Sequence, residues 1–394
     1  MNKTIKFLLG ICIGIPAIIL LAIAGLYVSG NGYVVKAFRT IILKGYSTTY
    51  IDDYVDFNNT VIRAGTPQPW KLHENYNKIR LTDTLRKELE DFHSVAFALV
   101  KDGKLLYEEY WDGYSDSSLT NSFSMAKTLT TMLLGKAIEQ NYVKSINQPL
   151  ADFLPEFLND SLGRLATVGD LANMRSGFSW EEAYYSPINM TTEAYFGDNV
   201  EKQLLKRHFE SRPGGKFKYL SANTQLLAIV LKRATGKSLA QYFSEEFWQP
   251  MGMEHDALWS LSGDIEKSFC CVYSDVRDFA RLGLLLLQKG NWNGRQILDS
   301  AFVDWMITPD PAAFEPDEPK MYAGSLWIDE EHNPPFYGMM GHLGQRIIVV
   351  PDENLVIIRL GKEKDSVNPR RGHLDTDVYY FVDEAVRMMK LWQK

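Results

Sequence analysis

A serine and a lysine three positions apart are the residues of this chain best suited to chemistry. Ser124 and Lys127 stand at the start of a mostly apolar run, residues 129–138, which predicts a helix. Positions i and i+3 share one helix face, so the Ser124 hydroxyl can lie within hydrogen-bond distance of the Lys127 amine. A partly desolvated lysine can lose its proton and act as base for an otherwise weak serine nucleophile. The pair therefore indicates acyl transfer, with a capping serine beside a surface lysine as the alternative.

The start of this helix adds a second element of the same chemistry. There the backbone N–H of Ser124 and the positive end of the helix dipole would face any oxyanion that forms. One turn of the chain thus supplies a nucleophile, a base and half of an oxyanion hole.

Two later segments can complete such a site. Tyr219 follows the turn signal Pro213–Gly215 and precedes an apolar helical run, and its phenol can relay a proton if neighbouring groups stabilise the phenolate. The segment Gly341-His342-Leu343-Gly344-Gln345 opens a strand, and its glycines permit close approach of the backbone to a ligand. The alternatives are a core tyrosine and a structural histidine.

The order of these three segments resembles the serine β-lactamase and penicillin-recognising superfamily. The resemblance is to the class C-like branch, which contains esterases and 6-aminohexanoate-dimer hydrolases, and it covers about residues 90–390. Ancillary stretches share it: Gln148-Pro149-Leu150 to Leu154-Pro155-Glu156, Met174-Arg175-Ser176-Gly177, Pro250-Met251-Gly252-Met253 and Gly290-Asn291-Trp292-Asn293-Gly294.

The resemblance implies a role for each matching residue. It makes Ser124 the nucleophile, Lys127 the base and Tyr219 the proton relay to the leaving group. The backbone N–H groups of Ser124 and Gln345 would form the oxyanion hole. The remaining matching positions, Ser221, His342 and Gly344, are expected to bind substrate.

Two departures from the family pattern affect the expected substrate. The family's Tyr-x-Asn reads Tyr219-Leu220-Ser221, which replaces an amide by a hydroxyl unless Asn223 substitutes for it. The Lys-Thr-Gly of β-lactamases reads His342-Leu343-Gly344, so the cation near the substrate carboxylate is missing. Strong penicillin binding is therefore not expected, whereas acyl transfer is.

Composition narrows the class of protein further. The 394 residues are 45% hydrophobic with a net charge of -7, which describes a globular chain and argues against a nucleic-acid partner. No metal-binding spacing or dinucleotide fingerprint occurs, so we expect neither a metal nor a cofactor. Of the three cysteines, Cys270 and Cys271 are adjacent, where a bridge would be strained, so no disulfide framework is expected.

The N-terminus predicts a membrane segment. Residues 7–28 are almost wholly apolar, follow Lys3 and Lys6, and approach the ~20 residues that span a bilayer. We expect a transmembrane anchor with an exported, extracytoplasmic domain; cleavage after Ala22-Ile23-Ala24 would instead give a secreted protein. A buried core helix is the remaining alternative.

The pattern of elements predicts an α+β fold. An antiparallel sheet is expected, flanked by N- and C-terminal helices and interrupted by a mostly helical insertion at about 122–300. The expected parts are a membrane segment (1–28), a connector (29–80) and a hydrolase domain (81–394). The elements expected in the last part are helices at 81–92 and 376–392, and hairpins at 95–111 and 346–360.

The sequence thus favours a membrane-anchored serine hydrolase that cleaves a small-molecule ester or small amide. A peptidase or amidase acting on D-amino-acid or cell-wall fragments is the alternative within chemistry. A non-catalytic ligand-binding or sensor domain of the same fold is the alternative outside it. Aromatic residues after Gly177 are expected to wall the pocket or to pack within the insertion: Trp180, Tyr184, Tyr185, Tyr195 and Phe196.

Overall fold

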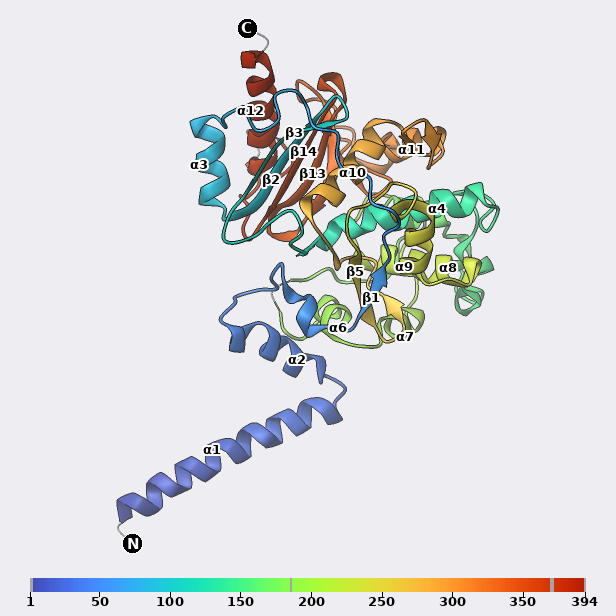
Figure 1. The fold of residues 1–394 in the computed structure, drawn as a ribbon. Helices are drawn as coiled ribbons and strands as arrows, with labels where there is room; N and C mark the ends of the chain where they lie inside the picture. The colour runs from blue at the N-terminus through green and yellow to red at the C-terminus, as the bar shows by residue number, and fades with distance from the viewer. Residues whose placement is uncertain (1–2, 185, 369–371, 393–394) are drawn as a thin grey trace.

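One antiparallel sheet brings strands from residues 94–110 and 322–361 together. The computed structural model describes residues 3–184, 186–368 and 372–392, with side chains described from residue 14 to 391. Seven strands follow the order β10-β11-β12-β13-β14-β2-β3 (Figure 1). They are β2 (Ser94–Lys101), β3 (Lys104–Tyr110), β10 (Tyr322–Ala323), β11 (Leu326–Asp329), β12 (Phe336–Gly341), β13 (Gln345–Val350) and β14 (Leu355–Gly361).

Helices cover both faces of this sheet. Helices α3 (Asp83–Asp91) and α12 (Thr376–Trp392) pack on one face, and α10 (Val276–Leu287) packs on the other (Figure 1). Because both faces are covered, β13 is buried along its whole length and reads as a continuous apolar run apart from its first two residues. The predicted hairpins and flanking helices of the sheet are confirmed.

The predicted insertion is less helical than expected. Its helices are α4 (Ala126–Glu139), α5 (Val168–Ala172), α6 (Met190–Phe196), α7 (Val200–Leu205), α8 (Ser221–Thr235), α9 (Leu239–Phe243), α10 and, at its end, α11 (Ser300–Met306). A second sheet accompanies them, in the order β1-β5-β7-β4 with β6 on β5. Its strands are β1 (Asn59–Ile62), β4 (Thr120–Asn121), β5 (Ala257–Ser262), β6 (Ile265–Glu266) and β7 (Val272–Ser274); β8 (Asn291–Trp292) and β9 (Arg295–Gln296) form a separate pair.

The segment expected to be a connector is part of the folded body. Within it, β1 pairs with β5, and α2 (Tyr33–Thr40) packs against α6. The buried Asp53 carboxylate accepts hydrogen bonds from Asn121 and Tyr273 at 2.9 Å each and from Tyr195. These bonds tie the segment to the strand that leads to Ser124.

The predicted transmembrane helix is not supported. The N-terminal segment forms α1 (Lys3–Val28), which extends away from the body (Figure 1). Within the part of the chain that the structure describes in full, no helix has the length and apolar character needed to cross a bilayer. Residues 7–13 of the expected anchor lie outside the described side chains.

Candidate active site

The two residues of the Ser-x-x-Lys pattern meet as predicted. Ser124 lies in a short 3-10 turn, Phe123–Met125, that runs directly into α4, and Lys127 occupies the first turn of that helix. The Lys127 Nζ donates to the Ser124 Oγ at 3.1 Å and to the carbonyl of Phe269 at 2.8 Å. Lys127 is only 1% exposed, and this burial lowers its pKa to about 8, against the opposing charge of Glu182. About a tenth of Lys127 is therefore neutral at pH 7 and able to accept a proton, against almost none for a lysine with its ordinary pKa of 10.5.

The backbone before the nucleophile adopts an unusual conformation. Phe123 has φ +43, in the left-handed region that a residue with a Cβ rarely adopts. Its N–H donates to the side-chain oxygen of Asn121 at 2.8 Å, and its ring packs edge-on against His342 with centroids 5.4 Å apart. This sharp bend turns the chain from β4 into α4 and leaves Ser124 half-buried at the bend.

Tyr219 lies beside both residues. Its phenol hydrogen-bonds Ser124, and the Lys127 Nζ lies 4.9 Å from the centre of its ring. Burial raises the pKa of Tyr219 well above 10, with Ser124 opposing and Glu182 adding to the shift. The ring stacks on Trp327 at 5.6 Å between centroids, which fixes its orientation. Tyr219 is thus a neutral phenol placed to pass a proton.

The segment Gly341–Gln345 forms the tight turn between β12 and β13. Leu343 and Gly344 both have positive φ, and Arg359 donates to their carbonyl oxygens at 3.0 Å each. The backbone N–H of Gln345, expected to be an oxyanion donor, donates instead to the His342 carbonyl. His342 borders both cavities with Ser124, and loss of hydration in the site together with the charges of Lys364 and Arg346 lowers its pKa, so the imidazole is neutral at pH 7.

The other residues expected to bind substrate, Ser221 and Gly344, and the possible substitute Asn223 lie in different surroundings. Ser221 lies close to Ser124, but its N–H and hydroxyl donate to Glu182 at 2.7 and 2.6 Å. Gly344 is buried against Arg359, where an added Cβ would meet Nη1 at 2.1 Å. Asn223 is fully buried and accepts a hydrogen bond from Ser176, so it does not replace the missing amide.

Two cavities meet at Ser124. The apolar cavity, of about 540 Å³, is walled by α2 and the following turn and by α6, and Lys127 and Phe269 also line it. The polar cavity, of about 720 Å³, is lined by Tyr219, Trp327 and a group of charged side chains. Ser124, Tyr184 and His342 border both cavities. The expected aromatic wall is present in part: Tyr184, Tyr195 and Phe196 line the apolar cavity, Trp180 does not, and Tyr185 lies outside the described residues.

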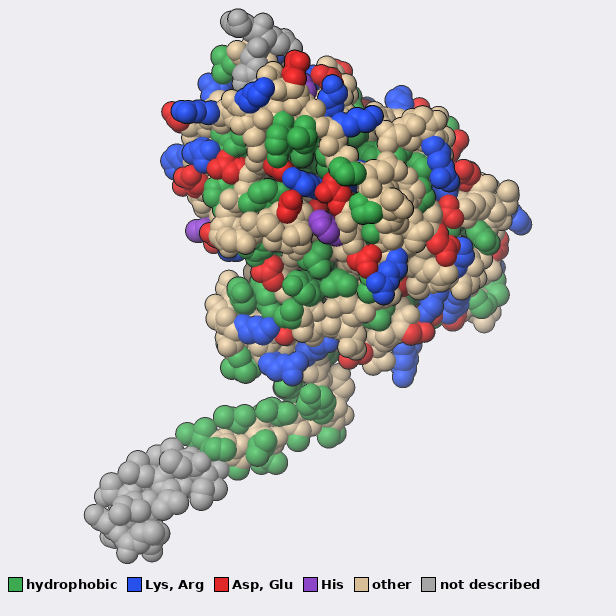
Figure 2. All heavy atoms as spheres, viewed as in Figure 1, with side chains coloured by type: hydrophobic (Ala, Val, Ile, Leu, Met, Phe, Trp, Pro, Cys, Tyr) green, Lys and Arg blue, Asp and Glu red, His purple; other side chains and the backbone are tan. Residues whose placement is uncertain are grey.

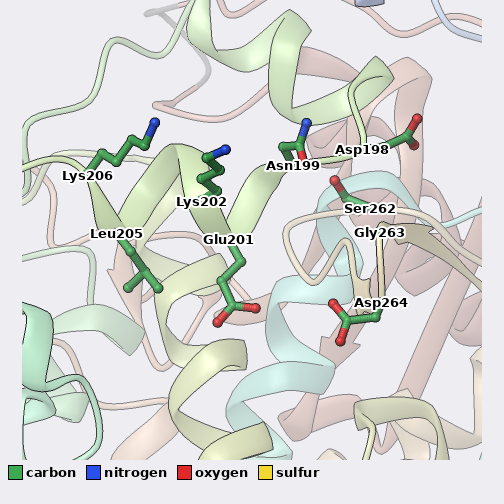
Figure 3. Close-up of a pocket in the computed structure, with 9 residues that line it drawn as sticks. All are labelled: Asp198, Asn199, Glu201, Lys202, Leu205, Lys206, Ser262, Gly263 and Asp264. Carbon is green, nitrogen blue, oxygen red and sulfur yellow. The ribbon is translucent and has the colours of Figure 1, made fainter.

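A different hollow, near α7, lacks these groups. Figure 3 shows its lining residues, several of them charged, between α7 and the β5–β6 turn. Two of its carboxylates are paired, Glu201 with Arg233 at 3.1 Å and Asp264 with Lys232 at 2.9 Å. No catalytic candidate lines it.

The adjacent cysteines depart from the expectation. Cys270 and Cys271 are joined by a disulfide, and Cys271 accommodates it with φ +73. Cys270 lines the apolar cavity, directly after the residue whose carbonyl binds Lys127.

Among the residues that the structure describes, one group of side chains has the geometry to hold a metal ion. His255, Asp275 and Asp278 place one ligand atom each within 4.8 Å of one another. The carboxylates are already used: Asp275 caps α10, and Asp278 accepts the backbone N–H groups of Glu254 and His255 at 2.8 and 3.0 Å. None of the three lines either cavity at Ser124.

Comparison with known proteins identifies the family. The Beta-lactamase family model matches residues 81–378. The chain belongs to this family. It is 24% identical over 307 residues to the 6-aminohexanoate-dimer hydrolase of Paenarthrobacter ureafaciens, covering 73% of this chain and 76% of that protein. A Bacillus anthracis structure described as a 6-aminohexanoate-dimer hydrolase superposes with a TM-score of 0.72 at 22% identity, covering 86% of this chain and 92% of that one.

A D-aminopeptidase of Brucella anthropi is similar to a smaller part of this chain. It is 28% identical over 166 residues, which cover 40% of this chain and only 31% of that protein. The relatives are hydrolases, in agreement with the class of enzyme predicted from Ser124, Lys127 and Tyr219.

Sequence reasoning missed several residues that shape the site. Glu182 accepts from Ser221 and, at 3.0 Å, from the Trp180 indole, and its charge acts on both Lys127 and Tyr219. Arg359 fixes the turn that holds His342. The sequence could have pointed to Arg359, because an arginine within the apolar run 355–361 is expected to be buried and a buried charge needs partners. Nothing in the local pattern marked Glu182.

Proposed function

We propose that this protein is a serine hydrolase that cleaves an ester or a small amide through an acyl-enzyme on Ser124. The observation that carries the proposal is the hydrogen bond from the buried Lys127 amine, with its lowered pKa, to the Ser124 hydroxyl. Tyr219 supports it, because its phenol hydrogen-bonds the same hydroxyl.

The reaction then runs in two steps. The Ser124 oxygen bonds to the carbonyl carbon while its proton passes to neutral Lys127. The tetrahedral intermediate collapses, the bond to the leaving group breaks, and Tyr219 gives that group a proton and regains one from the Lys127 ammonium. Water repeats the sequence on the acyl-enzyme and releases the acid and Ser124.

Two backbone N–H groups would hold the oxyanion. Ser124 supplies the first, at the bend into α4. Because the Gln345 N–H already donates to the His342 carbonyl, we propose the backbone N–H of His342, a residue that borders both cavities, as the second. Loss of one such donor typically costs ~10²–10³ in rate.

The D-amino-acid peptidase alternative has less support in the cavities. A substrate ammonium group needs a carboxylate partner, and among the described lining residues only Asp375 offers one. That carboxylate is paired with Arg346 at 2.7 Å and with Lys364 at 2.7 Å. Penicillin is also disfavoured, since neutral His342 stands where the family has a lysine.

We further propose that α1 attaches the enzyme to a membrane and that the catalytic part is exported. The support is the row of exposed apolar side chains on α1, including Ile18, Leu20 and Leu21 (Figure 2). The full chain should sediment with membranes and a chain lacking residues 1–30 should not. Equal distribution of the two would contradict the attachment.

Turnover of p-nitrophenyl acetate tests the hydrolase proposal. Ser124→Ala should reduce kcat/KM by ~10³ or more, because the covalent step loses its nucleophile. Ser117→Ala is the matched control, since Ser117 is exposed, lines neither cavity and should keep activity. Near-normal activity of Ser124→Ala in folded protein would contradict the proposal.

A further inference from the structure

We propose that the substrate carries a long apolar chain on its acyl side and a polar group on its leaving side. This inference rests on the proposed function and names its substrate class. The apolar cavity would hold the acyl chain, and the polar cavity would hold the leaving group.

The apolar cavity has the lining that a hydrocarbon chain needs. Its outer wall is formed by Val34, Ala37, Phe38 and Ile41, and the opposite wall includes Tyr195 and Phe196. Among its described lining residues only Lys127 is a cation, and none is a carboxylate. About 540 Å³ of such space exceeds what an acetyl group fills.

The polar cavity is built differently. Arg346, Lys364, His373 and Asp375 line it, with Arg346 and Lys364 both paired to the Asp375 carboxylate. An apolar chain bound here would displace water from these charged groups without offering them a hydrogen bond, which costs free energy. A polar group that can hydrogen-bond them is the better occupant.

The position of Tyr219 decides which half of the substrate enters which cavity. Tyr219 lines the polar cavity and not the apolar one. A proton relay has to lie on the side of the leaving group, because that atom takes the proton as the bond breaks. The leaving group therefore faces the polar cavity, and the acyl chain extends from Ser124 toward α2.

The rim of the apolar cavity carries apolar side chains that are exposed to solvent. Phe38 and Ile42 line the cavity and remain 52% and 54% exposed. Hydrophobic side chains gather on this face, and α2 follows directly after the exposed apolar helix α1 (Figure 2). An acyl chain can thus reach Ser124 from the exposed side chains of Phe38 and Ile42 through the apolar cavity.

Chain-length kinetics with the full-length protein test this inference. The probes are p-nitrophenyl esters from acetyl to decanoyl, used at a fixed detergent concentration below their own aggregation limits. The expected result is a rise in kcat/KM of up to ~4-fold per added methylene until the cavity is filled, the equivalent of ~0.8 kcal/mol per buried CH₂. Acetate esters of alcohols from ethyl to octyl should show no such rise.

Two variants assign the effect to the apolar cavity. Phe38→Asp should lower the ratio of kcat/KM for the octanoyl ester to that for the acetyl ester. Leu43→Asp should leave this ratio unchanged, because Leu43 is exposed on the same segment and does not line the cavity. Ala37→Phe fills the cavity and should move the optimum to shorter chains, which keeps the test valid if Phe38→Asp does not fold.

The contradicting outcomes separate the two proposals. Ser124-dependent acetyl turnover with no chain-length response, or with the response on the alcohol side, would overturn this inference and leave the hydrolase intact. The absence of Ser124-dependent turnover at every chain length would overturn both.

Discussion

Two buried lysines show what makes a catalytic base in this molecule. Lys127 and Lys267 are 1% and 0% exposed, and burial lowers the pKa of the first to about 8 and of the second to about 7. Lys127 donates to the Ser124 hydroxyl where two cavities meet. Lys267 donates to the Tyr195 carbonyl and lies 4.0 Å from the centre of the Phe57 ring, and it lines neither cavity. A lowered pKa therefore identifies a base only where a nucleophile and room for substrate accompany it.

Replacing Lys127 should have the largest effect on the rate among the changes that test this comparison. Lys127→Met removes the base but keeps a long side chain in the buried site. We expect kcat for p-nitrophenyl acetate to fall by ~10³, within the range of general-base contributions. Circular dichroism and thermal unfolding check the fold, and a loss of less than tenfold would assign the base elsewhere.

Tyr219→Phe should have the next largest effect. It removes the phenol that hydrogen-bonds Ser124 while the ring keeps its stacking on Trp327. The expected loss in kcat is ~10² for alkyl esters, which need their leaving group protonated, and smaller for p-nitrophenyl esters, whose leaving group departs as an anion. Equal losses for both classes would argue against a relay role.

The pH dependence of turnover follows from the Lys127 pKa. Only neutral Lys127 can accept the Ser124 proton, so kcat/KM should rise about tenfold per pH unit below the pKa and level off above about 8. Lys267→Met should leave this midpoint in place. A profile that falls between pH 7 and 9 would contradict the assignment.

Lys267→Met should have the smallest effect on turnover, within about threefold, and should act on stability instead. The folded pKa of Lys267, about 7, lies below its ordinary value of 10.5, so the unfolded chain binds more protons between these values. Stability therefore rises with pH in this window, by up to ~1.4 kcal/mol per pH unit for one group. The variant should show a flatter rise in Tm from pH 7 to 9, and an unchanged rise would mean that Lys267 does not titrate there.

Local patterns were sufficient for much of the fold and for the centre of the site. The hairpin of β2 and β3 and the helix α12 follow from periodicity and turn residues within short windows. Ser124 and Lys127 meet because one helical turn fixes their distance. These features depend on neighbours in the sequence.

Features that depend on distant segments could not be read from the sequence. The pairing of Asn59–Ile62 with Ala257–Ser262 joins strands far apart in the chain, and two-residue strands such as β4 carry no period. For the same reason, the sequence did not predict that α2 lines the apolar cavity beside Ser124 or that Glu182 accepts hydrogen bonds from Ser221. The Gln345 N–H could not be judged either, because the turn geometry decides its partner.

The central claim is that Ser124 becomes acylated. The most direct test is the intact mass of the full-length protein after reaction with a fluorophosphonate and, separately, with a slowly released ester, with Ser124→Ala alongside. We predict one adduct per chain, mapped by peptide analysis to the peptide containing Ser124 and absent from the variant. An unmodified folded protein, or equal labelling of Ser124→Ala, would contradict the account.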